Sequence, residues 1–171
     1  PGHVSWNSRV HHMRGTVNDL LNLYGENSKG IVWAHNTHIG DAEYTSMQST
    51  GEKNIGQLSR EGLGSDNVFL IGFTSYEGKV MAGSSWGAPM EEMTIPPAVS
   101  NSIEYKLNQI DHESFYLIFD KEDRIDKDLE VIGHRAVGVV YNPRGDERQF
   151  VPTIVPMRYD ALFFFKNTTA L

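Results

Sequence analysis

Apolar side chains near the start of the chain recur at the spacing of one face of an α-helix. The pattern predicts a helix over residues 7–24, which Ser5 or Asn7 can cap at its amino end. Gly25 follows the last apolar position and can take the left-handed conformation that closes many helices. The apolar stripe expected to face the interior contains Val10, Met13, Val17, Leu20, Leu21 and Tyr24, whereas Arg9, His11, His12 and Arg14 fall largely outside it.

Two shorter helices are predicted further along the chain. Asn54 is placed to cap an amphipathic helix over residues 55–63, and another helix is expected over residues 100–110. Residues 41–53 are polar and rich in small side chains, so we expect a long loop there. The highly charged residues 121–130 are expected to lie in solvent and to be partly helical.

Short apolar runs between these helices predict β-strands. Because the runs alternate with helical patterns, we expect an α/β fold with a mixed, partly parallel sheet flanked by helices, in a single domain covering residues 1–171. The strands expected in one sheet are residues 31–34, 68–73, 115–119, 136–141 and 161–165.

One part of this sheet is expected to be antiparallel. Residues 76–79 have the composition of a hairpin turn and lead into a short strand at residues 80–82. The prolines of residues 83–99 predict an irregular segment, in which Trp86 offers a flat apolar face that could cover a ligand.

The apolar run at residues 31–34 leads directly into His35, Asn36, Thr37 and His38. Side chains just past the carboxyl end of a buried strand point into the crevice where α/β proteins bind ligands. Two imidazoles on one turn can converge on a small volume, and Asn36 and Thr37 supply hydrogen-bonding groups that orient the rings. We therefore place a candidate site at this turn. In the loop that follows, Asp41, Glu43 and Tyr44 are the reactive candidates, since a carboxylate there could orient a histidine or act as a base.

Composition narrows the classes of function. A net charge of -7 and a pI near 5.4 argue against a nucleic-acid surface, which needs clustered cations. The absence of cysteine excludes disulfides, thiolate nucleophiles and cysteine-ligated zinc. No apolar run approaches the length of a membrane span and no leader is visible, so we expect a cytoplasmic protein without a membrane partner. Because the chain starts at Pro1 rather than at a methionine, we expect further sequence upstream. Four arginines, Arg135, Arg144, Arg148 and Arg158, make the last third locally basic and are expected on a solvated surface.

The segment from Trp33 to Asp41 resembles the signature of the erythromycin esterase family, whose members include proteins named for succinoglycan biosynthesis. The resemblance covers nearly the whole chain, but family members are about twice as long, so the sequence resembles only their carboxyl-terminal half. Further segments resemble family blocks in the same order: the first helix with Arg9 and Met13, then residues 51–58, 85–89, 138–141 and 158–161.

The resemblance implies metal-independent hydrolysis of an ester by activated water, without a cofactor. In the best-known members the ester is the macrolactone of a macrolide antibiotic. A histidine and glutamates of the amino-terminal half activate the water in that family, so the expected partners are a small-molecule ester and the amino-terminal half of the same protein. The paired cleft histidines match His35 and His38, and a cleft arginine matches Arg9. The family commonly follows that arginine with an aspartate, whereas Val10 stands here, so the carboxylate that would orient Arg9 is missing.

Two functions from different classes are carried forward. In the first, His35, His38 and Arg9 are catalytic residues of an ester hydrolase, and the substrate is contacted by Asn36, Asp41, Tyr44 and Trp86. In the second, the chain is a non-catalytic metal- or haem-binding protein of related fold, in which His35 and His38 hold a ligand with help from Asp41. The number of ligands that converge on one point discriminates between them.

Overall fold

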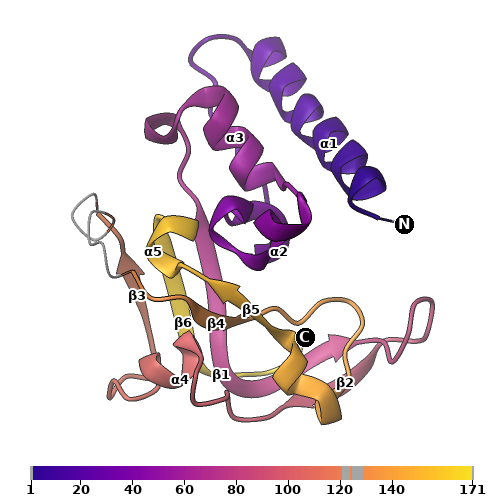
Figure 1. Ribbon diagram of the computed structural model, residues 1–171, viewed down its shortest axis with the longest axis vertical. Coiled ribbons are helices and arrows are strands. Elements are labelled where there is room, and N and C mark those ends of the chain that lie inside the picture. Colours follow the sequence, from indigo (N-terminus) through magenta and orange to yellow (C-terminus); the bar gives the residue numbers. More distant parts are fainter. Residues whose placement is uncertain (1, 121–123, 125–128, 171) are drawn as a thin grey trace.

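The computed structural model describes residues 2–120, 124 and 129–170 (Figure 1). Most of the charged segment at residues 121–130 therefore lies outside the described residues. The helices are α1 (His3–Tyr24), α2 (Asn36–Ile39), α3 (Ile55–Leu63), α4 (Ile103–Leu107) and α5 (Val155–Arg158). The strands are β1 (Ile71–Ala82), β2 (Glu91–Ile95), β3 (Ser114–Ile118), β4 (Ile132–Arg135), β5 (Phe150–Thr153) and β6 (Ala161–Thr168). Short 3₁₀ turns occupy Ala42–Tyr44, Ser46–Thr50, Ser65–Asn67 and Pro143–Gln149.

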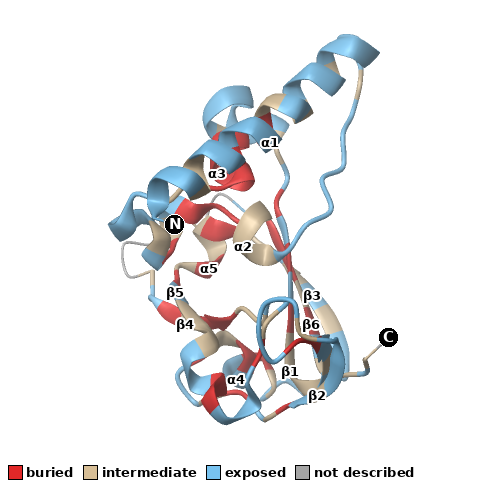
Figure 2. Ribbon diagram, turned by 90° about the vertical axis from the view of Figure 1, so that its right-hand side faces the viewer, coloured by how far each residue is buried: buried red, intermediate tan, exposed pale blue. Residues whose placement is uncertain are grey.

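The predicted helices are present, with different ends and different burial. Helix α1 starts earlier than predicted and closes at Gly25, whose φ is 93°. Its apolar stripe is mostly exposed, because only Val10 and Arg14 are buried, where the helix crosses α3. Figure 2 shows the carboxyl-terminal half of α1 standing away from the rest of the molecule. Helix α3 matches its predicted bounds because its start is fixed locally by the Asn54 side chain, which accepts a hydrogen bond from the Gln57 amide at 3.0 Å. The helix predicted at residues 100–110 is reduced to α4.

The main sheet has the strand order β2-β1-β6-β3 and is partly parallel, as predicted. Strands β1 and β6 are parallel, whereas β2 and β3 are antiparallel edge strands. The hairpin predicted at residues 76–79 is wrong, because β1 runs straight through this segment. Gly78 allows this continuation: its φ is 137°, and a Cβ there would lie 2.3 Å from the Thr168 carbonyl oxygen. The antiparallel partner is β2, in the segment that was predicted to be irregular.

Two predicted strands of this sheet are not strands. Residues 31–34 are extended but unpaired, and Ile31 and Trp33 are 93% and 87% exposed, because no strand within the described residues lies against them. Residues 136–141 form only an isolated bridge from Val140 to Gly83. In their place β4 and β5 form a separate two-stranded sheet.

The two faces of the main sheet differ sharply. One face carries the core, in which Leu162 and Phe164 are fully buried and pack with side chains from α4, β4 and α5. Figure 2 shows these elements gathered on that side of the sheet. On the other face, register places Phe73 and Tyr116 on either side of Phe163. The Phe73 ring stacks on Phe163 at a centroid distance of 5.3 Å, and the Tyr116 ring is tilted against it at 5.4 Å. This aromatic face continues into exposed apolar side chains at Ile71, Ile118 and Phe165.

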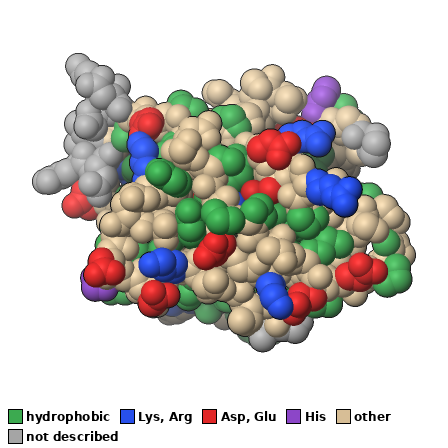
Figure 3. Space-filling view, turned by 90° about the horizontal axis from the view of Figure 1, so that it is seen from below, with side chains coloured by type: hydrophobic (Ala, Val, Ile, Leu, Met, Phe, Trp, Pro, Cys, Tyr) green, Lys and Arg blue, Asp and Glu red, His purple; other side chains and the backbone are tan. Residues whose placement is uncertain are grey.

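Charged side chains do not gather by sign on the face seen in Figure 3, where lysine and arginine are interspersed with aspartate and glutamate. None of the helices in the described part of the chain combines the length and apolarity needed to cross a bilayer.

Candidate functional site

His35 is held at the amino end of α2 by hydrogen bonds to both ring nitrogens. Its Nε2 lies 2.8 Å from the Val137 carbonyl oxygen, and its Nδ1 lies 3.2 Å from the Thr37 amide nitrogen and 2.9 Å from the Thr37 hydroxyl. A carbonyl can only accept, so we infer that Nε2 carries the proton and Nδ1 accepts from the Thr37 amide. The ring is therefore fixed in one tautomer and one orientation, although the residue remains exposed.

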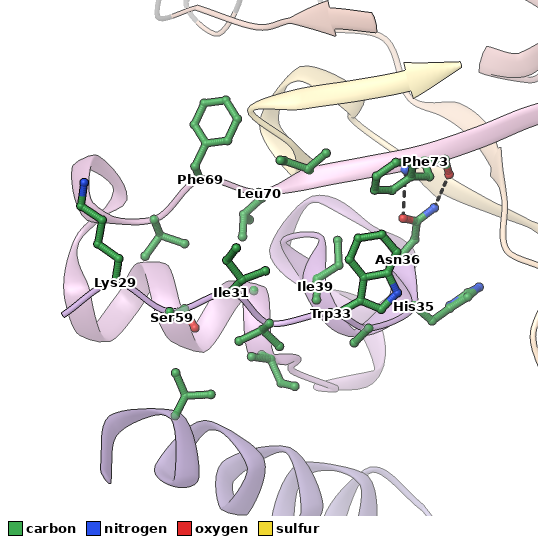
Figure 4. Close-up of a pocket in the computed structure, with 18 of the residues that line it drawn as sticks. Lys29, Ile31, Trp33, His35, Asn36, Ile39, Ser59, Phe69, Leu70 and Phe73 are labelled. Atoms are coloured by element: carbon green, nitrogen blue, oxygen red, sulfur yellow. Dashed lines mark hydrogen bonds between the residues drawn. The ribbon is translucent and has the colours of Figure 1, made fainter. Parts of the chain in front are cut away.

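Asn36 fastens this turn to the edge of the main sheet. Its Nδ2 donates to the Phe73 carbonyl oxygen at 2.5 Å, and its Oδ1 accepts from the Phe73 amide at 3.2 Å (Figure 4). This edge of β1 is free because β2 pairs only with residues 78–82. The carboxamide thus occupies hydrogen-bonding groups that a neighbouring strand would otherwise satisfy.

His38 and Arg9 meet through a side chain that the sequence did not single out. The His38 ring stacks on Trp6 at a centroid distance of 5.1 Å, and the Arg9 guanidinium lies 4.9 Å from the centroid of the same indole. Trp6 is anchored by its Nε1, which donates to the Lys53 carbonyl at 2.6 Å. The position of Trp6 just before the predicted helix start hid this role.

A cavity of about 1440 Å³ opens beside the turn. It runs between α1, α3, the extended residues 30–35 and the start of β1, and its wall is largely apolar. Figure 4 shows Ile31, Trp33, Phe69 and Phe73 on this wall, with His35 and Asn36 at one end. The residues that line the cavity within the described chain do not include His38, Arg9 or Trp86. Trp86, 85% exposed, therefore does not form the cavity rim that was expected of it.

Asp41 and Tyr44 lie in a second, smaller cavity of about 360 Å³. The Asp41 carboxylate accepts from the Glu43 amide at 3.1 Å and pairs with Arg60 at 3.1 Å. Burial raises the pKa of Asp41, and the hydrogen bond from Arg60 opposes that rise. Burial likewise raises the pKa of Tyr44. Asp41 is thus committed to capping the turn after α2 and to an ion pair, away from the histidines.

The electrostatics favour neutral histidines. Partial burial lowers the pKa of His35, with the positive charge of Arg158 acting in the same direction and the hydrogen bond to Val137 opposing it. Burial, Arg9 and His35 lower the pKa of His38. Within the described residues neither ring is within ion-pair distance of a carboxylate; the histidine that does face one is His134, 3.7 Å from Glu104. Nor do His35, His38 and Asp41 converge as a metal-binding group in the part of the chain that is described.

Behind the turn lies a buried polar cluster that sequence reasoning missed. It contains Glu104, His134, Arg158 and Tyr159, each no more than 1% exposed. Arg158 and Arg135 were both expected on a solvated surface. These two predictions are wrong, because each guanidinium is surrounded by protein hydrogen-bond acceptors. Arg144 and Arg148 are exposed, as expected. Arg158 and Tyr159 lie in a segment that carries the family resemblance, which was the available signal, but nothing in the sequence indicated their burial.

Known structures share this fold. A protein from Bacillus cereus matches with a TM-score of 0.64 and 20% identity, over 81% of this chain and 33% of that one. A succinoglycan biosynthesis protein matches with a TM-score of 0.58 and 22% identity over the same shares. A variant of erythromycin esterase EreC in its open conformation matches with a TM-score of 0.63 and 18% identity, over 92% of this chain and 36% of that one. The chain thus spans about one third of the length of these structures, less than the half that the resemblance implied.

The sequence pattern of the family described as erythromycin esterase matches residues 2–168. This match includes the histidine turn, the stacked Trp6 and the buried cluster behind them. The chain belongs to the erythromycin esterase family.

Proposed function

We propose that this chain forms the histidine-bearing wall of an ester hydrolase that cleaves its substrate with activated water. The observation that carries the proposal is the position of His35 and Asn36 at one end of the large apolar cavity. The cavity has a volume of about 1440 Å³ and is open to solvent, so it has room for a bulky ester as well as for side chains from the rest of the protein; a lactone of macrolide size is the proposed substrate class.

The roles proposed for the side chains follow from ester chemistry. Hydrolysis needs a base for the water and donors for the oxyanion that develops on the carbonyl. His35 is proposed to orient the substrate from the cavity wall. His38 and the Arg9 guanidinium lie side by side on Trp6, outside that wall among the described residues, and are proposed as oxyanion donors in the site that the rest of the protein completes. The base is proposed to lie elsewhere in the protein, because an oriented base needs a carboxylate partner and neither His35 nor His38 has one among the described residues.

The rest of the site is proposed to come from the amino-terminal part of the same protein. Three features call for such a partner: the aromatic face of the sheet, the unpaired residues 30–35 and the free edge of β1 beside them. Parallel strands are normally covered on both faces. A further layer packed here would cover the aromatic face and bring its own side chains to the cavity.

The test compares this chain with a longer form of the protein on macrolactones and simple aryl esters. We expect turnover only in the longer form and its loss, by at least about a hundredfold, in His35→Ala and His38→Ala. His112→Ala, an exposed histidine outside the cavity wall, is the matched control and should leave the rate unchanged. Comparable turnover by this chain alone, abolished by His35→Ala, would place the base within these residues and overturn the assignment.

A further inference from the structure

Arg158 is a buried cation without a carboxylate partner. It is 1% exposed, and no ion pair among the described residues includes it. Among the other buried arginine side chains, Arg14 hydrogen-bonds Asn18, whereas Arg60 pairs with Asp41 and Asp160, and Arg135 pairs with Asp146 at 2.9 Å. Because an uncompensated buried charge is costly, a fold that retains one gains something other than stability from it.

The Arg158 guanidinium forms a hydrogen bond to the backbone of the turn that carries His35 and His38. Its Nη2 donates to the Asn36 carbonyl oxygen at 3.2 Å, and its Nη1 donates to the Thr153 hydroxyl at 3.0 Å. The backbone of Arg158 holds the other end of the turn, because its carbonyl accepts from the Asp41 amide at 3.0 Å. Gly40 lies so close that a Cβ there would be 2.7 Å from Nε of Arg158. The start and the end of the turn are thus both fastened to one residue.

The second contact of Nη1 fixes the protonation of a buried histidine. Nη1 of Arg158 lies 3.3 Å from Nδ1 of His134, and the Tyr159 hydroxyl lies 3.4 Å from the same nitrogen. A guanidinium can only donate, so Nδ1 of His134 is an acceptor and the proton sits on Nε2, which faces Glu104. His134 therefore contributes no charge that would offset Arg158.

We propose that Arg158 is the positioning residue of this site: it holds the turn that carries His35 and presents a fixed positive charge to the back of the histidine cluster. The role deepens the proposed function, because a positive potential behind the wall stabilises an oxyanion formed at the cavity.

Glu104 and Asp41 oppose the charge of Arg158 in part, whereas burial lowers the pKa of its guanidinium. Arg158 on α5 and neutral His134 on β4 face His35. Burial raises the pKa of Glu104, and the Asp41 carboxylate is paired with Arg60. Protonation of His35 would also turn Nδ1, which accepts the Thr37 amide, into a donor. Charge and hydrogen bonding together keep this imidazole neutral.

The test is an imidazole titration by NMR in the chain of 171 residues, which involves no ester. We expect His35 to titrate below its usual value of 6.5 in the unaltered chain, which needs no variant to fold. Arg158→Met keeps the apolar stem without the charge and should raise the midpoint of His35. Arg158→Lys keeps the charge without the fork and should retain most of the depression. Arg144→Met is the control, an exposed arginine outside the cavity lining, and should leave His35 unchanged.

Two results would overturn the proposal: a His35 midpoint at or above 6.5 in the unaltered chain, or an unchanged midpoint in folded Arg158→Met. The outcome is separable from that of the proposed function. A shifted titration in a protein whose longer form hydrolyses no ester would support Arg158 as a positioning residue and reject the esterase. If the longer form is active and Arg158→Met leaves both the His35 titration and kcat unchanged, the esterase is supported and Arg158 is rejected as a positioning residue.

Discussion

Asn36 binds the backbone of Phe73 through both atoms of its carboxamide, at 2.5 and 3.2 Å. The side chain thereby takes the place of a neighbouring strand at the free edge of β1. Since Asn36 follows His35 directly, the location of the histidine depends on the edge of the sheet and not only on its own loop.

This contact predicts an unusual order of variants at position 36. Asn36→Ala should lower the free energy of unfolding by about 1 kcal/mol, because two partly exposed hydrogen bonds are lost. Asn36→Asp should cost more, because its second oxygen would face the Phe73 carbonyl where the amide now donates. Urea unfolding measures both. Asn22→Ala on the exposed surface of α1 is the control, and an aspartate variant as stable as the unaltered chain would contradict the contact.

Adjacent positions on β3 test whether one face of the sheet is bare. Ile118 is 63% exposed on the aromatic face, whereas Leu117 packs against the core. Ile118→Lys should change stability by no more than about 0.5 kcal/mol, and Leu117→Lys should cost about 3 kcal/mol or more.

The same pair reports on the proposed partner layer. Ile118→Lys should reduce binding of an apolar dye to this chain, and it should destabilise the longer form if the proposed layer covers that face. Equal tolerance of Ile118→Lys in both forms would mean that no layer packs on the aromatic face.

Sequence signals succeeded where structure is fixed locally. Helix α3 was predicted with its bounds because Asn54 caps it and Leu58 marks its buried face. Residues 31–34 have a strand-like pattern, and their extended backbone agrees with it, but pairing needs a second strand that the described residues do not supply. Strands β4 and β5 were missed because His134, Arg135 and Pro152 interrupt any apolar run.

The candidate site shows the same division. The turn with His35 and Asn36 lies beside a cavity, but residues 31–34, which indicated a site there, are not the buried strand on which that prediction rested. Trp6 and Arg158 could not be predicted, because an indole 32 positions from His38 and an arginine far along the chain reach the turn only through tertiary packing. Asp41 was placed in the site because its loop follows the histidine turn, but packing pairs it with Arg60.

Acid should destabilise the chain in a window set by its histidines. Burial holds the pKa of His134 well below 6.5, so the unfolded chain binds a proton that the folded chain resists. The stability that depends on neutral His134 is therefore complete above pH 6.5 and is lost as pH falls toward the folded pKa. His35 and His38 act in the same direction. The raised pKa values of Asp41 and Glu104 have the opposite sign and act upward from the ordinary carboxyl values, so they offset part of the histidine effect.

The measurement is urea unfolding at several values from about pH 7 to pH 5. Each histidine should contribute up to about 1.4 kcal/mol per pH unit in this window. His134→Asn, which keeps an acceptor for Arg158, should reduce the slope by about one proton. An identical slope in that variant would show that His134 is not the buried neutral group described here.

Gly40 allows the histidine turn to rest on Arg158 and Tyr159. A Cβ at this position would lie 2.6 Å from Cε1 of Tyr159 and 2.7 Å from Nε of Arg158, both in side chains that are fully enclosed. Its φ of -71° is ordinary, so any cost of Gly40→Ala arises from the close approach and not from the backbone. We expect Gly40→Ala to lower the free energy of unfolding in urea by about 2 kcal/mol.

Gly138→Ala, with no atom within 4 Å of its Cβ, is the matched control and should be neutral or slightly stabilising. Because a lifted turn would also weaken the Arg158 contact to the Asn36 carbonyl, the His35 ring resonances should shift in Gly40→Ala and stay in place in Gly138→Ala. A Gly40→Ala chain that keeps both its stability and its His35 resonances would show that the turn does not bear on Arg158.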